Sequence, residues 1–288
     1  MTAPGSPDRA RPVDLHSHST ASDGALPPER VVQAARDAGL AAIALTDHDA
    51  IDGLAPARAA GERLGVRVVA GVELSAYAGE REVHMLGLQL HRLEPLEEAL
   101  RGFRAHRVDR AGRMVEKLNG LGVPVTMAAV LDQAQDGAVG RPHVARALVS
   151  GGWARDSRDA FDRYLGHGRP ANVPKHRLEI GEAIRLVHEA GGVAIWAHPG
   201  PDGTREAVER MVALGLDGLE VRHPGHTPQD STRLAALVEH FRLVPSGGSD
   251  WHGAVDGPRV LGCMQVPHEW LERQEERAER HRSHERVA

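Results

Sequence analysis

Residues 13–18 read VDLHSH, a short apolar run that ends in two histidines. Five further runs show the same pattern, because each carries a histidine or a carboxylate near one of its ends. They are IALTDHD (43–49), VVAGVE (68–73), VHMLGL (83–88), VAIWAHPG (193–200) and LVPSGGSDWH (243–252). Short runs rich in Val, Ile and Leu are typical of buried strands. When parallel strands form a barrel, polar groups at their ends gather at one rim.

The strand ends predict one set of candidate metal ligands. Its members are His16, His18, Asp23, His48, Glu73, His84, His198, Asp250 and His252. His16 and His18 are two residues apart, so in a strand their side chains share a face. Six strands with such ends are hard to explain as unrelated surface or core groups, and we therefore expect one metal centre.

Three further carboxylates are expected to orient these histidines. Asp47 and Asp49 flank His48, and Asp14 lies on the strand face that carries His16. A carboxylate that accepts the second ring proton of an imidazole fixes its orientation at a metal.

Composition excludes several classes of protein. Of 288 residues, 41% are hydrophobic and 26% charged, as in ordinary soluble globular proteins. The net charge of -5 gives no global reason to bind nucleic acid or anionic membranes, although bound divalent cations would reverse the sign locally. The single cysteine, Cys263, suits a reducing compartment. No apolar stretch approaches a membrane span, and the N-terminal residues lack the apolar core of a signal peptide. We expect a cytoplasmic protein without a membrane partner, and the oligomeric state stays open.

Strand and helix patterns divide the chain into five parts. They are a polar, disordered tail at 1–11, alternating strands and helices at 12–93, helices alone at 94–179, renewed alternation at 180–266, and a charged tail at 267–288. The alternation predicts a parallel sheet or barrel, and the helical stretch an insert of domain size. We expect the C-terminal tail to form a solvated or frayed helix.

The ordered motifs DLHSHSTASDG, ALTDHD, GVELSA, AHPG and SDWHG, together with the strand that carries His84, resemble those of the PHP (polymerase and histidinol phosphatase) superfamily. The resemblance spans residues 13–263. It implies a distorted (β/α)7 barrel, the PHP fold, with a helical insert and up to three divalent metal ions at the C-terminal strand ends. It further implies three sites, formed by His16, His18, Glu73 and Asp250, by Glu73, His84 and His198, and by Asp23, His48 and His252.

Counting ligands and charges indicates a phosphorylated substrate. Nine ligands, with Glu73 used twice, make ten bonds to three ions, so coordination positions stay open. The ions would carry six positive charges against three carboxylates, and the surplus suits a phosphate better than an amide carbonyl. We expect a metal-dependent phosphoester hydrolase that uses metal-activated water. The expected catalytic residues are Glu73, Asp250, His252 and Asp14. Mn, Fe and Zn suit this ligand set about equally.

The insert indicates the substrate class. Its GRPHVARALV (140–149) and AFDRYLGHGRPANVP (160–174) motifs resemble a bacterial subgroup that includes 3′,5′-nucleoside bisphosphate phosphatases and a 5′→3′ exoribonuclease. That resemblance implies a small phosphorylated nucleotide (pAp-like), or short RNA or DNA ends, as substrate. Arg141 and His143 lie at a predicted helix N-terminus, which favours anions. The expected substrate-binding residues are Arg141, His143, Lys175 and His223.

Two positions depart from the subgroup. Asn172 and Arg222 stand where it usually has aromatic residues, which puts stacking on a base in doubt. With only 3% aromatic residues, a long stacked single strand is not expected.

Three alternatives compete with this hypothesis. A histidinol-phosphate-type phosphatase would use the same chemistry, but the helical insert argues against it. An amide or ester hydrolase on a similar barrel would be favoured by a carbamylated strand-end lysine, and the sequence has no lysine there. A non-catalytic metal-binding module would be expected to have lost ligands, and all nine are present.

Overall fold

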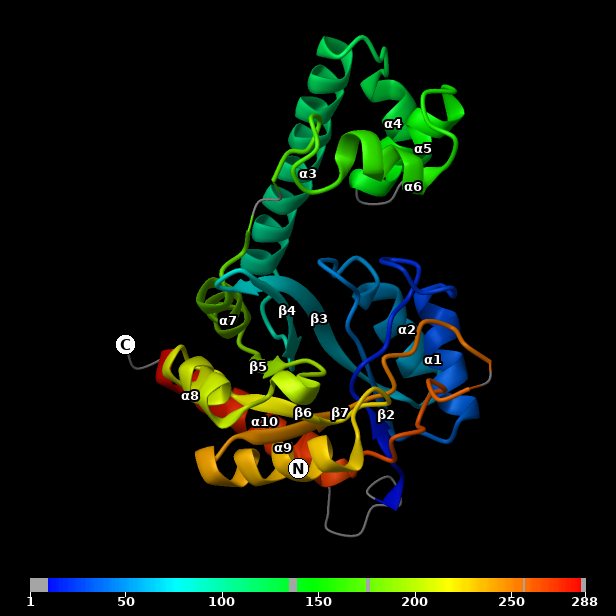
Figure 1. The fold of residues 1–288 in the computed structure, drawn as a ribbon. Coiled ribbons are helices and arrows are strands. Elements are labelled where there is room, and N and C mark those ends of the chain that lie inside the picture. Colours follow the sequence, from blue (N-terminus) through cyan, green and yellow to red (C-terminus); the bar gives the residue numbers. More distant parts are fainter. Residues whose placement is uncertain (1–9, 135–138, 175–176, 256, 286–288) are drawn as a thin grey trace. The chain divides into compact units, whose positions relative to one another are not determined.

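The structure is a computed structural model that describes residues 10–134, 139–174, 177–255 and 257–285 (Figure 1). The chain divides into two compact units. We call Met1–Glu97 with Leu178–Ala288 the barrel unit, and Glu98–Arg177 the insert unit.

Seven strands form one sheet in chain order. They are β1 (Val13–Asp14), β2 (Ala42–Leu45), β3 (Arg67–Ala78), β4 (Arg81–Leu88), β5 (Val193–Trp196), β6 (Gly218–Arg222) and β7 (Val244–Gly247). The backbone N–H of Leu15 donates to the carbonyl of Gly247 at 3.1 Å, and Ser17 bridges to Trp251. These contacts join the first strand to the last, so the sheet is a nearly closed barrel, and the predicted fold class is confirmed.

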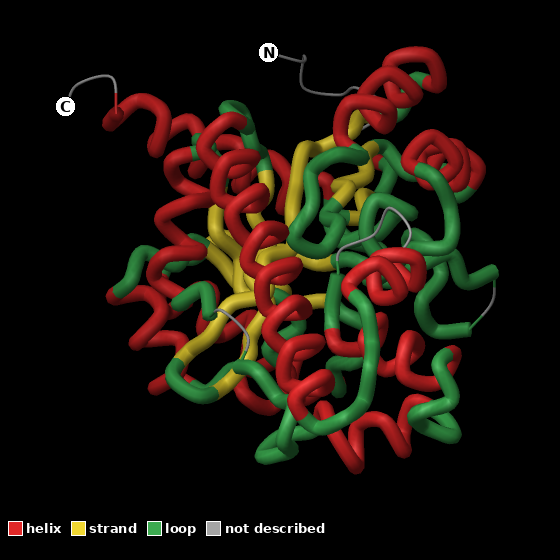
Figure 2. Tube along the Cα trace, turned by 90° about the horizontal axis from the view of Figure 1, so that it is seen from above, coloured by secondary structure: helices red, strands yellow, loops and turns green. Residues whose placement is uncertain are grey.

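The helices of the barrel unit lie outside the strands, as Figure 2 shows. They are α1 (Pro28–Asp37), α2 (Leu54–Leu64), α7 (Ile180–Glu189), α8 (Arg205–Ala213), α9 (Pro228–Phe241), α10 (His268–Glu285) and the short 3₁₀ helix η3 (Gly200–Asp202). Helix α7 buries Ala183, Ile184 and Val187, the spacing of one apolar face. Strands β2 and β5 are buried along their whole length, because helices cover the outside of the barrel and side chains fill its inside.

One expectation about the sheet is wrong. Strand β4 runs antiparallel to both β3 and β5, whereas alternation predicted parallel strands. Only Gly79 and Glu80 separate β3 from β4, and a two-residue connection makes a hairpin because it cannot span a crossover. The φ of +65° at Gly79 suits this tight turn.

The charged tail is helical as expected, but it is not solvated all round. Leu271, Gln274 and Ala278 of α10 are fully buried and share one helix face. Gln274 Nε2 donates to the carbonyl of Pro245 at 2.8 Å, and Arg282 Nη1 to that of Gly191 at 3.1 Å. Helix α10 therefore packs on the barrel and belongs to its core.

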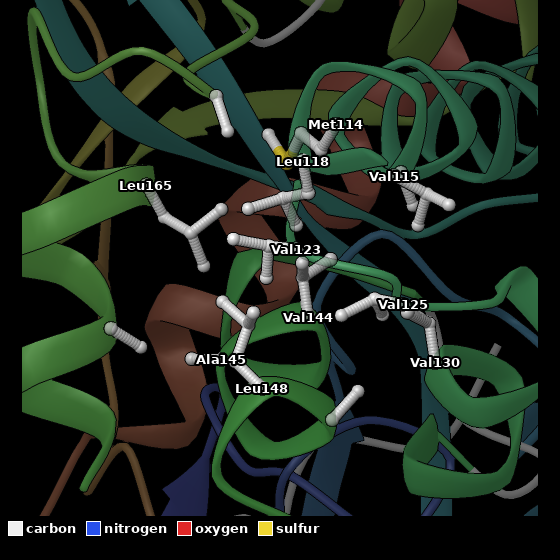
Figure 3. Close-up of a cluster of buried hydrophobic side chains, with 14 of the residues drawn as sticks. Met114, Val115, Leu118, Val123, Val125, Val130, Val144, Ala145, Leu148 and Leu165 are labelled. Carbon is white, nitrogen blue, oxygen red and sulfur yellow. The ribbon is translucent and has the colours of Figure 1, made fainter. Parts of the chain in front are cut away.

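In its described part, the insert unit contains helices joined by loops and no strand. Helix α3 (Glu94–Gly120) begins in the barrel unit and continues into the insert, followed by α4 (Met127–Ala134), α5 (Arg141–Ser150), α6 (Ser157–Ala160) and the π-helix η2 (Phe161–Leu165). Figure 3 shows the core of the insert, in which Leu118 of α3, Leu148 of α5 and Leu165 are fully buried.

Candidate metal centre

The carboxylate of Glu73, in the middle of β3, lies at the centre of the site with its side chain 1% exposed. Imidazole nitrogens face both of its oxygens. Nδ1 of His84 and Nε2 of His198 lie 2.8 and 3.0 Å from Oε1, and nitrogens of His16, His18 and His48 lie 3.2, 3.2 and 3.3 Å from Oε2. One carboxylate thus contacts five of the predicted ligands.

Asp250 lies on one side of this centre. Its Oδ1 is 3.4 Å from Nε2 of His16 and 3.2 Å from Nε2 of His18. Its Oδ2 lies 3.3 Å from Nε2 of His223 and forms an ion pair with Arg259. Asp250 therefore contacts the same two imidazole nitrogens as Oε2 of Glu73.

Asp23 forms the more exposed part of the centre. Its Oδ1 lies 3.3 Å from Nε2 of His252 and 3.7 Å from Nδ1 of His18, and its Oδ2 lies 4.0 Å from Nε2 of His48. The Asp23 side chain is 56% exposed. The structure therefore brings all nine predicted ligands together, although they come from both ends of the chain.

Local backbone structure holds these groups at the barrel rim. Asp47 accepts hydrogen bonds from the backbone N–H and the hydroxyl of Ser19, at 2.7 and 2.8 Å, which fixes the loop after His18. His198 and Asp250 have positive φ values of 32° and 51°. Non-glycine residues rarely adopt this conformation, and when they do they cluster at functional sites.

The ionisation of the centre follows from its charges. Burial by itself would lower the pKa of His16, but the carboxylates of Glu220 and Glu73 outweigh it and raise that pKa well above the ordinary value. Burial likewise opposes ionisation of Glu73 and Asp250, but the surrounding imidazoles lower both pKa values. The hydrogen bond to His252 lowers the pKa of Asp23 to about 2. All three carboxylates are therefore ionised near neutral pH.

The donor set fits divalent metal ions. Both ring nitrogens of His18 are buried without a hydrogen bond, an arrangement that is costly unless a ligand satisfies them. Three groups offer ligand atoms within 4.8 Å of one another. They are His16, His18, Glu73 and Asp250, then His18, Asp23, His48 and His252, and then His48, Glu73 and His84. His198 joins through Oε1 of Glu73. Imidazole with carboxylate, without thiolate, is a typical set for first-row divalent ions.

The role expected of Asp14 belongs to another residue. The buried Asp14 carboxylate accepts hydrogen bonds from the backbone N–H groups of Ser249 and Gly262, both at 2.9 Å, and does not hold the His16 ring. Oε1 of Glu220 lies 3.0 Å from Nδ1 of His16 instead. Asp14 thus anchors backbone around the centre, and burial raises its pKa.

Glu220 was not among the site residues predicted from the sequence. It is fully buried in β6, and its Oε2 also accepts from the backbone N–H of His198 at 2.6 Å. The available signal was a carboxylate inside the apolar run at 216–221, since buried carboxylates are rare unless paired. Arg259, which pairs with Asp250, was also missed because it lies in a loop with no strand pattern.

The expectation for the neighbours of His48 is also corrected. The ring nitrogens of His48 face Glu73 and Asp23, which leaves neither for Asp47 or Asp49. Asp49 accepts from the backbone N–H of Ser75 at 3.0 Å and thereby ties the loop to β3.

The expected substrate-binding residues lie in different parts of the molecule. His223 is buried in the barrel unit beside Asp250. Arg141 and His143 lie in the first turn of α5 in the insert unit, where Nδ1 of His143 accepts from the N–H of Gly140 at 2.9 Å and so caps the helix. Lys175 lies outside the described residues.

The two departures from the subgroup have structural partners. Asn172 Nδ2 donates to the carbonyl of Gly166 at 2.7 Å. The guanidinium of Arg222 lies 5.0 Å from the ring centre of Trp270 and donates to the carbonyls of Met264 and Gln265. Arg222 therefore helps to fasten α10 to the barrel.

Comparison with known proteins agrees with this geometry. The model of the PHP domain family matches residues 14–121. A 3′,5′-nucleoside bisphosphate phosphatase from Chromobacterium violaceum is 36% identical over 257 residues, which cover 87% of this chain and 90% of that protein. The 5′-3′ exoribonuclease Rnm of Escherichia coli is 38% identical and covers 83% of this chain and 84% of its own. A phosphoribosyl 1,2-cyclic phosphate 1,2-diphosphodiesterase from Eggerthella lenta is 38% identical, with coverage of 83% and 94%.

Solved structures are similar over nearly the whole chain. A protein described as a metal-dependent phosphoesterase from Bifidobacterium adolescentis superposes with a TM-score of 0.72 and 34% identity, covering 92% of this chain and 96% of its own. A Chromobacterium violaceum protein described as an amidohydrolase, with bound sulfate, superposes with a TM-score of 0.69 and 32% identity, covering 91% and 96%.

The chain therefore belongs to the PHP family. It is a phosphoester hydrolase of the metal-dependent class that this barrel supports, and the predicted family and enzyme class are confirmed. Among the described residues, no helix combines the length and apolar character needed to cross a membrane.

Proposed function

We propose that this chain hydrolyses a phosphomonoester of a small nucleotide, such as a 3′,5′-nucleoside bisphosphate, with two to three divalent metal ions. The observation that carries the proposal is the Glu73 carboxylate with imidazoles at both oxygens. A carboxylate placed in this way can bridge two ions, and ions roughly 3.5–4 Å apart are the arrangement that two-metal phosphoester hydrolases use.

The charge of the centre supports a phosphate over a neutral substrate. Three divalent ions would carry six positive charges. Four carboxylates in the described centre would offset four of them: Asp23, Glu73, Asp250 and the buried Glu220. The surplus of two, with the guanidinium of Arg259 beside Asp250, favours a dianionic phosphate. A neutral amide would not use this charge.

Bound ions would polarise the phosphoryl oxygens and lower the pKa of a water molecule. The residues of the chain hold and orient this chemistry. Glu73 and Asp250 present fixed carboxylates, and Glu220 holds the His16 ring through Nδ1, which leaves Nε2 facing the centre. The N–H of Gly225 donates to Nδ1 of His223 at 3.0 Å, which orients the ring with Nε2 toward Asp250. Nε2 of His223 lies 3.3 Å from Oδ2 of Asp250, and we propose that it contacts a phosphate oxygen when substrate binds beside Asp250.

The substrate class is inferred from chemistry that the relatives share. The names of the three relatives refer to a nucleoside bisphosphate, an RNA and a phosphoribosyl cyclic phosphate, all of which carry phosphate on a ribose. Asn172 and Arg222 offer no aromatic surface and are engaged elsewhere, which favours a mono- or dinucleotide over a long strand. Arg141, His143, Lys175 and His223 are proposed to bind its phosphates.

The test is phosphate release by the purified protein with Mn²⁺, from pAp, histidinol phosphate, p-nitrophenyl phosphate and a short 5′-phosphorylated RNA. We expect pAp to have the highest kcat/KM. Glu73→Ala should lose this turnover, whereas Glu209→Ala, on the exposed face of α8, should keep it.

The outcomes separate the candidates. Stepwise release of mononucleotides from the RNA, at a higher kcat/KM than pAp, would replace the proposal by an exoribonuclease activity. Preference for histidinol phosphate would favour that class of phosphatase. A protein that binds Mn²⁺ and releases no phosphate from any substrate would contradict the proposal outright.

A further inference from the structure

A second cluster of possible metal ligands lies outside the centre described above. His188 is in the last turn of α7, Asp217 directly precedes β6, and His281 is near the end of α10. Helix α10 passes behind the strands of the barrel unit in the view of Figure 1. The cluster thus joins three segments that are far apart in the sequence.

The two imidazoles present the same atom to one carboxylate. Nε2 of His188 lies 2.7 Å from Oδ2 of Asp217, and Nε2 of His281 lies 2.8 Å from Oδ1. The two rings stack with centres 4.3 Å apart and planes inclined by 30°, and their Nε2 atoms contact the two oxygens of the same carboxylate. Ligand atoms of the three residues all lie within 4.8 Å of one another.

The carboxylate is held from its other side. The backbone N–H of Ala194 donates to Oδ2 at 3.0 Å, and Nη1 of Arg277 donates to Oδ1 at 3.2 Å. Each carboxylate oxygen has two acceptor positions, so one on each oxygen remains for the side of the imidazoles. The Asp217 side chain is 3% exposed, whereas those of His188 and His281 are 26% and 28% exposed. The cluster therefore combines a fixed carboxylate with imidazoles that solvent reaches.

These features match a three-ligand metal site. The distances resemble those of the first centre, in which Nδ1 of His84 lies 2.8 Å from Oε1 of Glu73. Two imidazoles and a carboxylate are a common protein ligand set for Zn²⁺, with water in the fourth position, and partners behind a ligand carboxylate orient it. The competing arrangement is a metal-free clasp, in which each imidazole donates an N–H hydrogen bond to the Asp217 carboxylate.

We propose that His188, Asp217 and His281 form a metal site for Zn²⁺ or a similar divalent ion, and that the ion fastens α10 to the barrel. The ion would bind the folded chain and not the unfolded one, because the three ligands meet only after folding. The proposal is independent of the phosphoesterase function, since none of these residues belongs to the first centre.

The test compares metal content. Metal-stripped protein is loaded with Zn²⁺, desalted and analysed for bound zinc, as wild type, His188→Gln, His281→Gln and His240→Gln. His240 is an exposed histidine on α9 and serves as the matched control. We expect one fewer zinc ion per chain in His188→Gln and His281→Gln, and no change in His240→Gln. Mn²⁺-dependent phosphate release should be unchanged in all three variants.

A second measurement does not require substitutions in the cluster. In the Glu73→Ala background, added Zn²⁺ should slow amide hydrogen exchange in residues 268–285 more than in the rest of the chain. Equal zinc content in wild type and both cluster variants, or exchange in α10 that zinc does not change, would overturn the site in favour of the metal-free clasp. A missing ion accompanied by lost phosphate release would also overturn it, because the first centre would then account for the loss.

Discussion

The barrel unit and the insert unit bury different chemistry. In the barrel, Glu73, Glu220, His16 and His18 are all at most 1% exposed and contact one another through charges. In the insert, the buried cluster consists of alanine, valine, leucine and methionine side chains around Leu118 and Leu148 (Figure 3). Apolar packing stabilises a fold by burial alone, whereas buried charges are costly and persist where they serve a site. The comparison is consistent with the proposal that the barrel carries the metal centre, whereas the described core of the insert is apolar.

The largest expected effect comes from removing the central carboxylate. Glu73→Ala should lower kcat/KM by about 1000-fold or more, because it removes a carboxylate that contacts five of the predicted imidazole ligands. This expected loss exceeds the roughly 10–100-fold that is typical when a residue hydrogen-bonded to a metal ligand is replaced. Metal content and kcat/KM are to be measured together, and a variant with full metal content and normal turnover would show that the barrel charges are not the active centre.

Removing packing in the insert should have a different signature. Leu148→Ala deletes a fully buried side chain and should lower the free energy of unfolding of the insert unit by roughly 2–5 kcal/mol. Hydrogen exchange in the insert would increase, while the metal content of the protein stays at the wild-type level. Loss of bound metal in this variant would contradict the separation of the two units.

Glu220→Gln tests a positioning residue in the barrel. The amide keeps the shape of the side chain but loses its charge, and its single oxygen cannot serve both Nδ1 of His16 and the backbone N–H of His198. We expect metal affinity or kcat/KM to fall about 10–100-fold. The effect should appear in metal titrations as well as in turnover, and Glu209→Ala provides the neutral comparison. A purely structural role would lower thermal stability without changing metal affinity.

Metal affinity should depend on pH. Burial by itself would lower the pKa of His16, but Glu220 and Glu73 raise it well above 6.5, so the metal-free ring binds a proton that the ion must displace. Apparent affinity should therefore rise with pH and level off above the raised pKa. The slope should reach about tenfold per pH unit for each proton displaced. Competition with a chelator from pH 5 to 9 measures it, and a flat profile would show that His16 does not compete with protons for the metal.

The smallest effect is expected at a helix cap. The Thr227 hydroxyl accepts from the N–H of Asp230 at 3.1 Å and donates to its carboxylate at 2.6 Å, which begins α9 with a capping box. Thr227→Ala should destabilise the barrel unit by about 1 kcal/mol. Thermal unfolding measures the loss, and activity at low temperature should be unchanged. A decrease of more than about 3 kcal/mol in the free energy of unfolding would contradict this interpretation, because the loss of one helix cap costs less than that.

Several parts of the site could be read from the sequence because they depend on local patterns. The apolar runs place polar groups at strand ends, and the spacing of His16 and His18 sets a shared face. The break in alternation after 93 marks the helical insert for the same reason. The helix at 54–64 ends at Gly65, whose φ of +68° suits a helix terminus.

Other features depend on contacts between distant segments. Glu220 meets His16 across 204 residues, and His281 meets Asp217 across 64. No spacing rule links such pairs, because strand pairing and helix docking determine which side chains meet. The direction of β4 and the packing of α10 were missed for similar reasons, since a short hairpin and a buried helix face act through neighbours in space.

By itself, the sequence identified nine candidate metal ligands in or beside the strands of a barrel of the PHP class, but the structure places Glu73 and His84 inside β3 and β4 and not at strand ends. The tertiary structure decided that one carboxylate, Glu73, faces five imidazoles and that Glu220, not Asp14, holds the ring of His16. The physical reason is the range of the interactions. Apolar periodicity acts over a few neighbouring residues, whereas a charge in the barrel interacts with whatever groups folding brings within a few ångströms.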